Sequence, residues 1–288
     1  MPANSSIKLP VIKVSNDDRE NFPDSLAVEE PLEIRLEYGP VENRQVKNIS
    51  VTMRTPGNDA ELAVGFLFTE GILKDQADVI SGEHCFISCY ENKENVIVVK
   101  LREDVTPNLR NTERNFYTTS SCGVCGKASI NAIKTVSAFE SKSGANIISA
   151  EILYQLPETL KQQQQVFADT GGLHASALFD QKGELILLRE DVGRHNALDK
   201  LIGAALNKGM LPLDEHILLL SGRASFELVQ KAAMAGINII AAVGAPSSLA
   251  VQLAEEFNIT LIGFLRGRRF NIYTAASRVL MNTYENTY

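Results

Sequence analysis

Two cysteines lie three positions apart in the segment Ser121-Cys122-Gly123-Val124-Cys125-Gly126. A polar loop precedes them and a helical pattern follows over 127–139, so both thiols are expected at a helix N-terminus. The helix dipole and Lys127 favour a thiolate there, and the thiolate is the reactive form of cysteine. A Cys-x-x-Cys pair supports dithiol redox exchange, half of a zinc site, or a nucleophilic cysteine that accepts sulfur as a persulfide. The spacing alone leaves these three chemistries open.

Two further cysteines bear on the zinc alternative. Cys85 and Cys89 could complete a set of four thiolates with the Cys122 pair. If 86–90 is a strand, however, residues four apart share a face but lie too far apart along it for easy chelation, and buried cysteines commonly act as small apolar side chains. A thioredoxin-like redox site would lie in a βαβ context, whereas this loop follows predicted hairpins. Both alternatives are weakened and both stay open.

A second group of residues could bind an anion. Three apolar segments are predicted as parallel strands, and the loops that leave the carboxyl ends of parallel strands meet at one edge of a sheet, where α/β proteins bind ligands. Two of these loops lead into helix N-termini, which favour anions, and arginine suits bidentate contacts with phosphate. The loops are Ser221-Gly222-Arg223-Ala224-Ser225, Gly244-Ala245-Pro246-Ser247-Ser248 and Phe264-Leu265-Arg266-Gly267-Arg268-Arg269. A phosphate or pyrophosphate ligand is expected, although capping serines and solvated or paired arginines would explain each loop alone.

Two histidine-containing segments could face the same edge. His174 follows Gly171-Gly172 and could be held in a turn, or it could orient a ligand or transfer a proton. In the segment 190–200, Asp191 is expected to cap a helix, and His195 and Asp199 are expected to meet one turn apart. Glu190 or His195 could in addition face the cleft.

The elements that position these residues divide the chain unevenly. We expect a polar tail over 1–25 and a β-rich domain over 26–145, which ends in the Cys-x-x-Cys loop and its helix. Alternating strands are predicted at 32–36 and 46–53, a helix at 60–68, and a hairpin from 86–90 and 96–101. A Gln-rich helix over 150–167, bent or divided at Pro157, introduces the remainder.

The part from 146 to 288 has the pattern of an α/β domain. A hairpin is predicted from 174–179 and 185–188, and a helix follows to about Leu206. Short apolar strands at 217–220, 237–243 and 259–264 alternate with helices at 225–235 and 247–257, which is typical of parallel βαβ units buried on both faces. The predicted fold class is therefore α/β, with an α+β N-terminal part.

Composition excludes several classes of protein. The chain has 288 residues, of which 44% are hydrophobic, and this suffices for a full core. A formal net charge of −7 disfavours a general nucleic-acid binder. We find no apolar run long enough for a membrane span and no secretory signal, so a cytoplasmic location with reduced thiols is expected.

Taken together, these motifs resemble the FdhD/NarQ family of formate dehydrogenase accessory proteins. The resemblance rests on the Cys122 segment, on Thr170-Gly171-Gly172-Leu173-His174-Ala175, on 190–200, on the Ser221 loop, and on the Phe264 loop with Ile272-Tyr273-Thr274. It covers nearly the whole chain from about residue 30. The combination is highly specific, although each motif alone is not.

The resemblance implies a sulfur carrier, classed as a sulfurtransferase. Such a protein receives persulfide sulfur from a cysteine desulfurase and passes it to the bis-molybdopterin guanine dinucleotide form of the molybdenum cofactor, which formate dehydrogenase needs. It implies that Cys122 carries the sulfur, that Cys125 assists, and that the stretch 264–269 binds the molybdenum cofactor. The cofactor is bound as a substrate, so no permanent cofactor and no metal site are expected. A cytidine-deaminase-like three-layer α/β/α domain, a homodimer, and contact with the formate dehydrogenase catalytic subunit are implied as well.

This sequence departs from the family pattern in places. Arg266-Gly267-Arg268-Arg269 stands where other members can have a Lys-Pro-Gly-Arg run, so the pairing of arginines with phosphates is open. A deaminase activity is not expected, because zinc deaminases need a His-x-Glu and a Pro-Cys-x-x-Cys, whereas His174 is followed by Ala175-Ser176. The rival hypotheses are a non-catalytic scaffold stabilised by zinc on four cysteines and a cofactor-binding chaperone.

Overall fold

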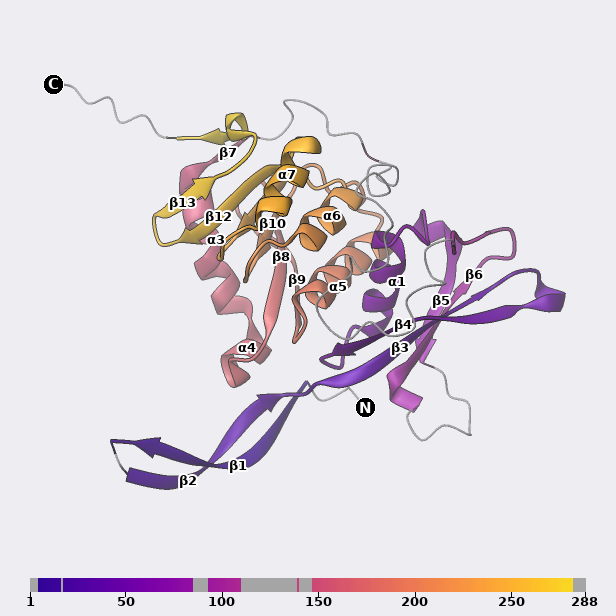
Figure 1. Ribbon diagram of the computed structural model, residues 1–288, viewed down its shortest axis with the longest axis horizontal. Coiled ribbons are helices and arrows are strands. Elements are labelled where there is room, and N and C mark those ends of the chain that lie inside the picture. Colours follow the sequence, from indigo (N-terminus) through magenta and orange to yellow (C-terminus); the bar gives the residue numbers. More distant parts are fainter. Residues whose placement is uncertain (1–4, 17, 85–92, 110–138, 140–146, 282–288) are drawn as a thin grey trace.

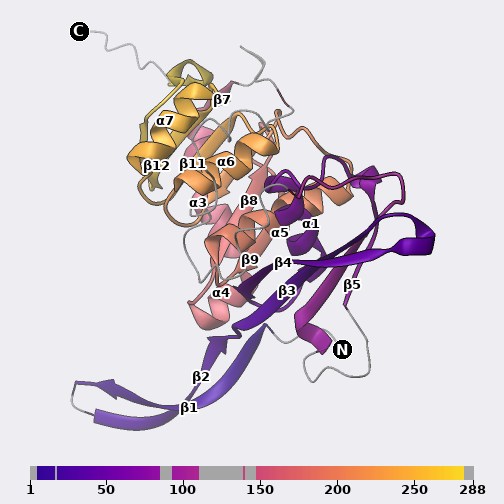
Figure 2. The ribbon, with the colours of Figure 1, turned by 45° about the vertical axis from the view of Figure 1, so that its right-hand side comes forward.

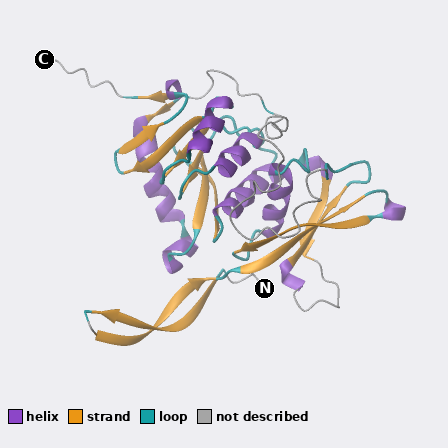
Figure 3. Ribbon diagram, viewed as in Figure 1, coloured by secondary structure: helices purple, strands orange, loops and turns teal. Residues whose placement is uncertain are grey.

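The computed structural model describes residues 5–16, 18–84, 93–109, 139 and 147–281. Within these ranges the chain forms two larger sheets with helices packed between and around them, and a two-stranded ribbon that extends from the body (Figure 1). Sheets and helices are intermixed along the chain, as the predicted α/β class requires (Figure 3).

The C-terminal part is built on a six-stranded sheet with the order β13-β12-β11-β10-β8-β9. The predicted parallel strands are confirmed, because β10 pairs in parallel with β11 and β11 with β12. The predicted hairpin is confirmed as well, since β8 and β9 are antiparallel. The strands are β8 His174–Phe179, β9 Leu185–Asp191, β10 Ile217–Leu220, β11 Ile239–Ala242, β12 Thr260–Arg266 and β13 Arg269–Ile272.

Helices cover both faces of this sheet, which gives the expected three-layer α/β/α arrangement. Successive residues of a strand point to opposite faces. Leu218 and Leu220 accordingly pack with the cluster that contains the helices α5, α6 and α7, whereas Ile217 and Leu219 pack with α3 on the other face. The helices are α3 Ala150–Gln163, α5 Arg194–Asn207, α6 Phe226–Met234 and α7 Ser248–Glu256.

The Gln-rich helix is divided, but not at Pro157. It consists of α3 and the short helix α4 Gln165–Thr170, and Gln164 between them has a ψ of 88°, which no α-helix accommodates. Pro157 lies inside α3. Just before α3, strand β7 Ile148–Ser149 pairs with β14 Val279–Leu280 near the other end of the described chain.

The N-terminal part contains a four-stranded sheet with the order β4-β3-β6-β5. Its strands are β3 Glu30–Tyr38, β4 Gln45–Arg54, β5 Val79–His84 and β6 Val96–Leu101, and the helix α1 Asp59–Thr69 packs on it. The strands at 32–36 and 46–53 and the helix at 60–68 are thereby confirmed. The strand that pairs antiparallel with β6 is β5, however, and residues 86–90, which were expected to do so, lie outside the described residues. Four 3-10 turns complete the described chain, η1 Val41–Asn43, η2 Gln76–Asp78, η3 Lys93–Asn95 and η4 Ala276–Arg278.

The two parts share one core, because α1 packs directly against α5. At this crossing a Cβ placed on Gly65 would lie 1.9 Å from the Asp199 carbonyl oxygen, and one on Gly203 would lie 2.0 Å from the Glu61 carbonyl oxygen. Only glycine permits such a close approach of two backbones. The predicted boundary between 145 and 146 touches residues outside the described ranges and stays a prediction.

The N-terminal segment differs from the polar tail expected over 1–25. Its described residues form a ribbon of β1 Ser6–Ser15 and β2 Asp18–Ala27, paired antiparallel along ten positions (Figures 1 and 2). Ile7, Leu9 and Val11 share one face with Phe22 and Leu26 across the ribbon. Charged residues between them conceal this alternation, so the segment reads as polar.

Candidate functional site

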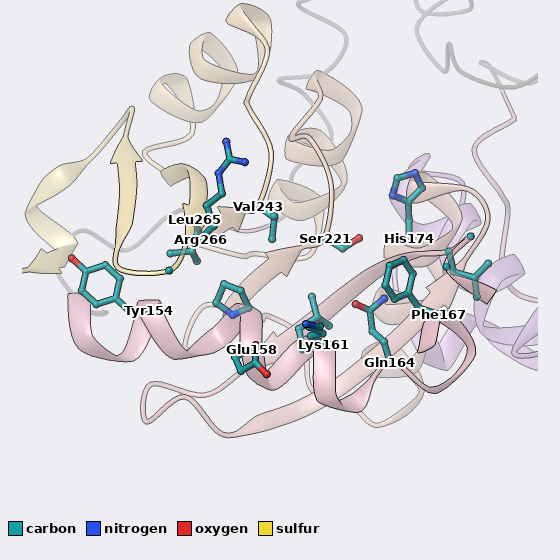
Figure 4. Close-up of a pocket in the computed structure, with 16 residues that line it drawn as sticks. Tyr154, Glu158, Lys161, Gln164, Phe167, His174, Ser221, Val243, Leu265 and Arg266 are labelled. Carbon is teal, nitrogen blue, oxygen red and sulfur yellow. The ribbon is translucent and has the colours of Figure 1, made fainter. Parts of the chain in front are cut away.

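A cavity of about 620 Å³ lies at the carboxyl edge of the parallel strands. Its walls come from α3, from α4 and the loop after it, and from the ends of β8, β10, β11 and β12 (Figure 4). This is the edge at which the predicted loops were expected to meet. The lining residues are Tyr154, Pro157, Glu158, Leu160, Lys161, Gln164, Phe167, Gly171, Gly172, Leu173, His174, Ser221, Val243, Leu265, Arg266 and Gly267.

The cavity brings together five of the predicted site residues. They come from three separate segments of the chain: parallel connection brings the ends of β10 and β12 to one edge, and the antiparallel strand β8 begins at that edge with His174. The five are His174, Ser221, Leu265, Arg266 and Gly267. The side chain of Arg266 is exposed and extends away from α3 in Figure 4, with its guanidinium carbon 5.8 Å from the ring centroid of Phe264.

The other predicted residues of these loops do not line the cavity. Arg268 forms an ion pair with Glu151, its Nη1 lying 3.0 Å from Oε2, and stacks over Tyr154. Arg269 and Arg223 are exposed, and Ser225 lies against His195 instead. The structure therefore places these arginines outside the cavity, because the stretch after β12 is a β-hairpin tip rather than an open loop. Their contact with a phosphate stays a prediction.

The helix α3 supplies a wall that sequence reasoning missed. Tyr154, Glu158 and Lys161 follow one another at helical spacing on the side that faces the cavity, while Leu153, Leu156 and Leu160 anchor the helix in the core. Lys161 is exposed at the rim and brings a positive charge. The amphipathic pattern of 150–163 was visible in the sequence, but the sheet edge that α3 covers was not.

Glu190 holds the other wall in place. Its carboxylate accepts hydrogen bonds from the backbone amides of Val166 and Phe167 at the start of α4, at 3.2 and 3.0 Å. The Gln164 side chain lies 3.5 Å from the same carboxylate. Acceptors at a helix N-terminus satisfy amides that have no partner within the helix. Glu190 thus acts on the cleft through α4 and fixes the position of Phe167.

His174 forms the inner end of the cavity. A Cβ placed on Gly222 would lie 3.3 Å from the His174 Nδ1, so the ring packs on the backbone of the loop after β10. Burial lowers the pKa of His174, and the nearby positive charge of Arg194 lowers it further. The imidazole is therefore neutral at neutral pH. Beside it, the Ser221 hydroxyl accepts a hydrogen bond from the Ala175 amide at 2.8 Å.

The start of α5 differs from the prediction in two respects. Asp191 does not cap the helix: the N-cap is Gly193, and the Asp191 carboxylate is buried and pairs with Lys200 at 2.7 Å. His195 and Asp199 do not pair either. Asp199 accepts hydrogen bonds from the Lys231 ammonium at 3.0 Å, whereas the His195 Nε2 lies 3.4 Å from the Ser225 hydroxyl. Two of these groups link the two parts of the chain, because Asp191 accepts a hydrogen bond from the Thr55 amide and Asp199 accepts one from the Thr69 hydroxyl.

The cysteines lie outside the described residues, namely Cys85, Cys89, Cys122 and Cys125. The flanks of the second pair are described: Asn108 donates a backbone hydrogen bond to the Ile72 carbonyl at 3.4 Å, and the ring of Phe139 packs near Gly236. Within the described ranges no group of His, Cys, Asp and Glu residues is arranged to hold a metal ion. The four-thiolate zinc site stays untested.

Comparison with known proteins gives a consistent assignment. The model of the FdhD/NarQ family matches residues 27–280. The chain is 49% identical over 274 residues to the sulfur carrier protein FdhD of Streptomyces coelicolor, covering 94% of each chain. It is 50% identical over 271 residues to the protein of the same name from Mycobacterium tuberculosis, covering 92% of this chain and 95% of that one.

The fold has a counterpart among solved structures. A crystal structure of a Desulfotalea psychrophila protein, described provisionally as a formate dehydrogenase accessory protein, superposes with a TM-score of 0.73 and 23% identity. The superposition covers 96% of this chain and all of the other. None of the helices in the described ranges has both the length and the apolar character that a membrane crossing needs.

Proposed function

Because this chain belongs to the FdhD/NarQ family, we propose that it is a sulfur carrier that takes persulfide sulfur from a cysteine desulfurase and delivers it to a molybdenum cofactor. The substrate is the bis-molybdopterin guanine dinucleotide form, and the beneficiary is the catalytic subunit of formate dehydrogenase. The names of the relatives support the sulfur-carrying role. We further propose that the protein acts in the cytoplasm as a homodimer.

The chemistry assigned to Cys122 is thiolate exchange. The Cys122 thiolate attacks the terminal sulfur of the donor persulfide, the sulfur–sulfur bond of the donor breaks, and the donor leaves as a thiolate. Attack of the Cys125 thiolate on the inner sulfur of the Cys122 persulfide then releases hydrosulfide and leaves a Cys122–Cys125 disulfide. An external dithiol is required to reduce that disulfide. Cys122 therefore carries the sulfur, and Cys125 has the assisting role.

The cavity at the carboxyl ends of the parallel strands supports the proposal that the protein binds the guanine dinucleotide cofactor. Its volume of about 620 Å³ falls within the range of small-molecule sites. Lys161 offers a positive charge at the rim, and Ser221 and the backbone of Gly267 allow close approach by phosphate oxygens. Tyr154 and Phe167 provide aromatic surface for a guanine ring. A guanine dinucleotide thus meets the charge and the apolar surface that it requires.

A mass measurement tests the carrier role. The full-length protein is incubated with a cysteine desulfurase and cysteine, and the peptide that contains Cys122 is weighed. We expect a gain of about 32 Da, one sulfur atom, that is absent from Cys122→Ala. A gain confined to Cys85 or Cys89 would reject Cys122 as the carrier.

A binding measurement tests the cavity separately. Guanosine diphosphate is titrated calorimetrically into the protein, and Lys161→Ala is expected to weaken binding by roughly tenfold, the loss of one charge-assisted contact. Lys208→Ala is the matched control, because Lys208 is equally cationic and exposed but does not line the cavity. Equal affinities for wild type and Lys161→Ala would place the nucleotide elsewhere.

The rival functions make different predictions. A scaffold stabilised by zinc on the four cysteines requires stoichiometric zinc, which elemental analysis detects and which mutation of either cysteine pair would remove. A cofactor-binding chaperone would bind guanosine diphosphate without any mass gain on Cys122. The mass, binding and zinc measurements together therefore distinguish all three hypotheses.

A further inference from the structure

A second group of polar side chains lies behind His174, where the N-termini of α5 and α6 meet. The contact between the two helices is made by His195 and Ser225, whose Nε2 and Oγ atoms are 3.4 Å apart. Neither helix has a side-chain cap: the N-cap residues Gly193 and Ser225 form no capping hydrogen bond. The first-turn amides of the two helices are therefore not satisfied by the side chain of either N-cap residue.

Arg194 supplies an uncompensated positive charge at this place. Its side chain is partly buried, and its Nε atom is enclosed without a hydrogen-bond partner. No carboxylate in the described part of the chain forms an ion pair with it. The nearest acid along the chain, Asp191, is already paired with Lys200 at 2.7 Å. Burying the Nε atom of a guanidinium without a hydrogen-bond partner is costly unless an acceptor completes its surroundings.

The neighbouring histidines do not add charge that would repel a guanidinium. Burial lowers the pKa of His195 to about 4, assisted by the charges of Arg194 and Lys231, and the carboxylate of Glu227 at 3.8 Å does not reverse this. His174 is neutral for the same two reasons, burial and Arg194. Both imidazoles can therefore donate an N–H to an acceptor, and the charges next to them are those of Arg194 and Glu227.

A buried serine points to the same space independently. Ser176 is 1% exposed, and its hydroxyl has no partner among the described residues. It lies two positions after His174 on β8, so both side chains leave the same face of the sheet. That face is the one covered by α5 and α6, because Leu178, two positions further on, packs with those helices. An orphaned hydroxyl on the face that α5 and α6 cover is a donor that lacks its acceptor.

We propose that Arg194, with His174, His195 and the first turn of α5, forms a subsite for a small anion directly behind the cavity. His174 belongs to both places, since it lines the cavity and is the strand partner of Asp191, three residues before Arg194. The anion has one of two sources: a phosphate of the nucleotide substrate, or hydrosulfide on its way to that substrate. The existence of the subsite rests on the geometry alone, and only the naming of the two sources rests on the proposed function.

Histidine resonances provide a readout that does not depend on activity. The chain has only four histidines, so the imidazole signals of the ¹⁵N-histidine-labelled full-length protein can be assigned by substitution. Inorganic phosphate and sodium hydrosulfide are titrated separately. We expect saturable shifts and a raised pKa at His174 and His195, with His84 and His216 unchanged. In Arg194→Gln the dissociation constant should rise roughly tenfold or more, the effect of losing a charge-assisted contact.

Two controls make the outcome decisive. Arg19→Gln removes the same charge from the exposed ribbon and should leave anion binding intact, and Arg194→Lys, which keeps the charge, should retain part of the affinity. Competition by guanosine diphosphate would assign the site to the substrate's phosphate, whereas hydrosulfide binding that persists with the nucleotide bound would assign it to sulfur. The proposal is overturned if neither anion shifts His174 and His195, or if Arg194→Gln binds as wild type does. A missing mass gain on Cys122 would contradict the carrier role and leave this result untouched.

Discussion

Replacing Lys200 by methionine should destabilise the protein strongly, because it leaves a buried carboxylate without its cation. The Lys200 ammonium lies 2.7 Å from Asp191 and donates to the Thr55 carbonyl at 2.8 Å, and Lys200 and Asp191 are 1% and 0% exposed. Removing one partner of such a pair typically costs about 3–5 kcal/mol. Asp191 keeps hydrogen bonds from the backbone amides of Gly193 and Thr55 at 2.8 and 3.2 Å, which favours the lower end, about 3 kcal/mol.

Urea denaturation followed by circular dichroism measures this cost. Domains are commonly stable by about 5–15 kcal/mol, so a loss of about 3 kcal/mol should move the midpoint clearly. Lys208→Met, on the exposed last turn of the same helix, should change the free energy of unfolding by less than about 0.5 kcal/mol. The double variant Asp191→Asn with Lys200→Met should recover part of the loss. A cost below about 1 kcal/mol for Lys200→Met, or full additivity in the double variant, would refute this account of the pair.

Two further predictions concern the crossing of α1 and α5 and the pH dependence of stability in the N-terminal sheet. Gly203→Ala should lower the free energy of unfolding by at least about 1–3 kcal/mol, because the new Cβ would lie 2.0 Å from the Glu61 carbonyl oxygen, and a thermal melt unchanged from wild type would contradict the close crossing. His84 accepts charge readily because Asp59 forms a hydrogen bond with it and raises its pKa, so the stability it contributes is present below pH 6.5 and is lost as pH rises through the raised pKa. Relative to His84→Gln, the wild type should therefore lose stability on going from pH 6 to pH 9 in urea titrations; parallel pH profiles would show that the contact with Asp59 contributes nothing.

The sequence predicted the parallel strands and their helices well, because their signals are local. Ile217 to Leu220 is apolar at every position, as a strand buried on both faces requires, and Ser247 caps α7 as expected, accepting from the Ala250 amide at 3.2 Å. The edge at which the loops meet followed from the parallel connection. Ser221 and Leu265 accordingly lie together in the cavity, and the antiparallel strand β8 begins at the same edge with His174.

The parts that could not be predicted depend on contacts between distant segments. Asp191 looks like a cap beside its helix, and only its contacts with Lys200 and Thr55 show that it is a buried link between the two parts. Arg268 looks like a phosphate ligand until Glu151, far away in the sequence, is seen to pair with it. The role of Lys161 was hidden for the same reason, since no local pattern indicates which sheet edge α3 will cover.

The close crossing of α1 and α5 has a consequence for how the protein is made. Thr69 and Asp199, which form a hydrogen bond at this crossing, are 130 positions apart. A ribosome adding about 5–20 residues per second needs roughly ten seconds to bridge such a separation. During that interval the apolar side of α1 has been synthesised but its partner helix α5 has not, so the nascent chain exposes an apolar surface that favours aggregation. We therefore expect ribosome-associated chaperones to engage the first third of this chain, and a slowing of synthesis before α5 to reduce the yield of folded protein.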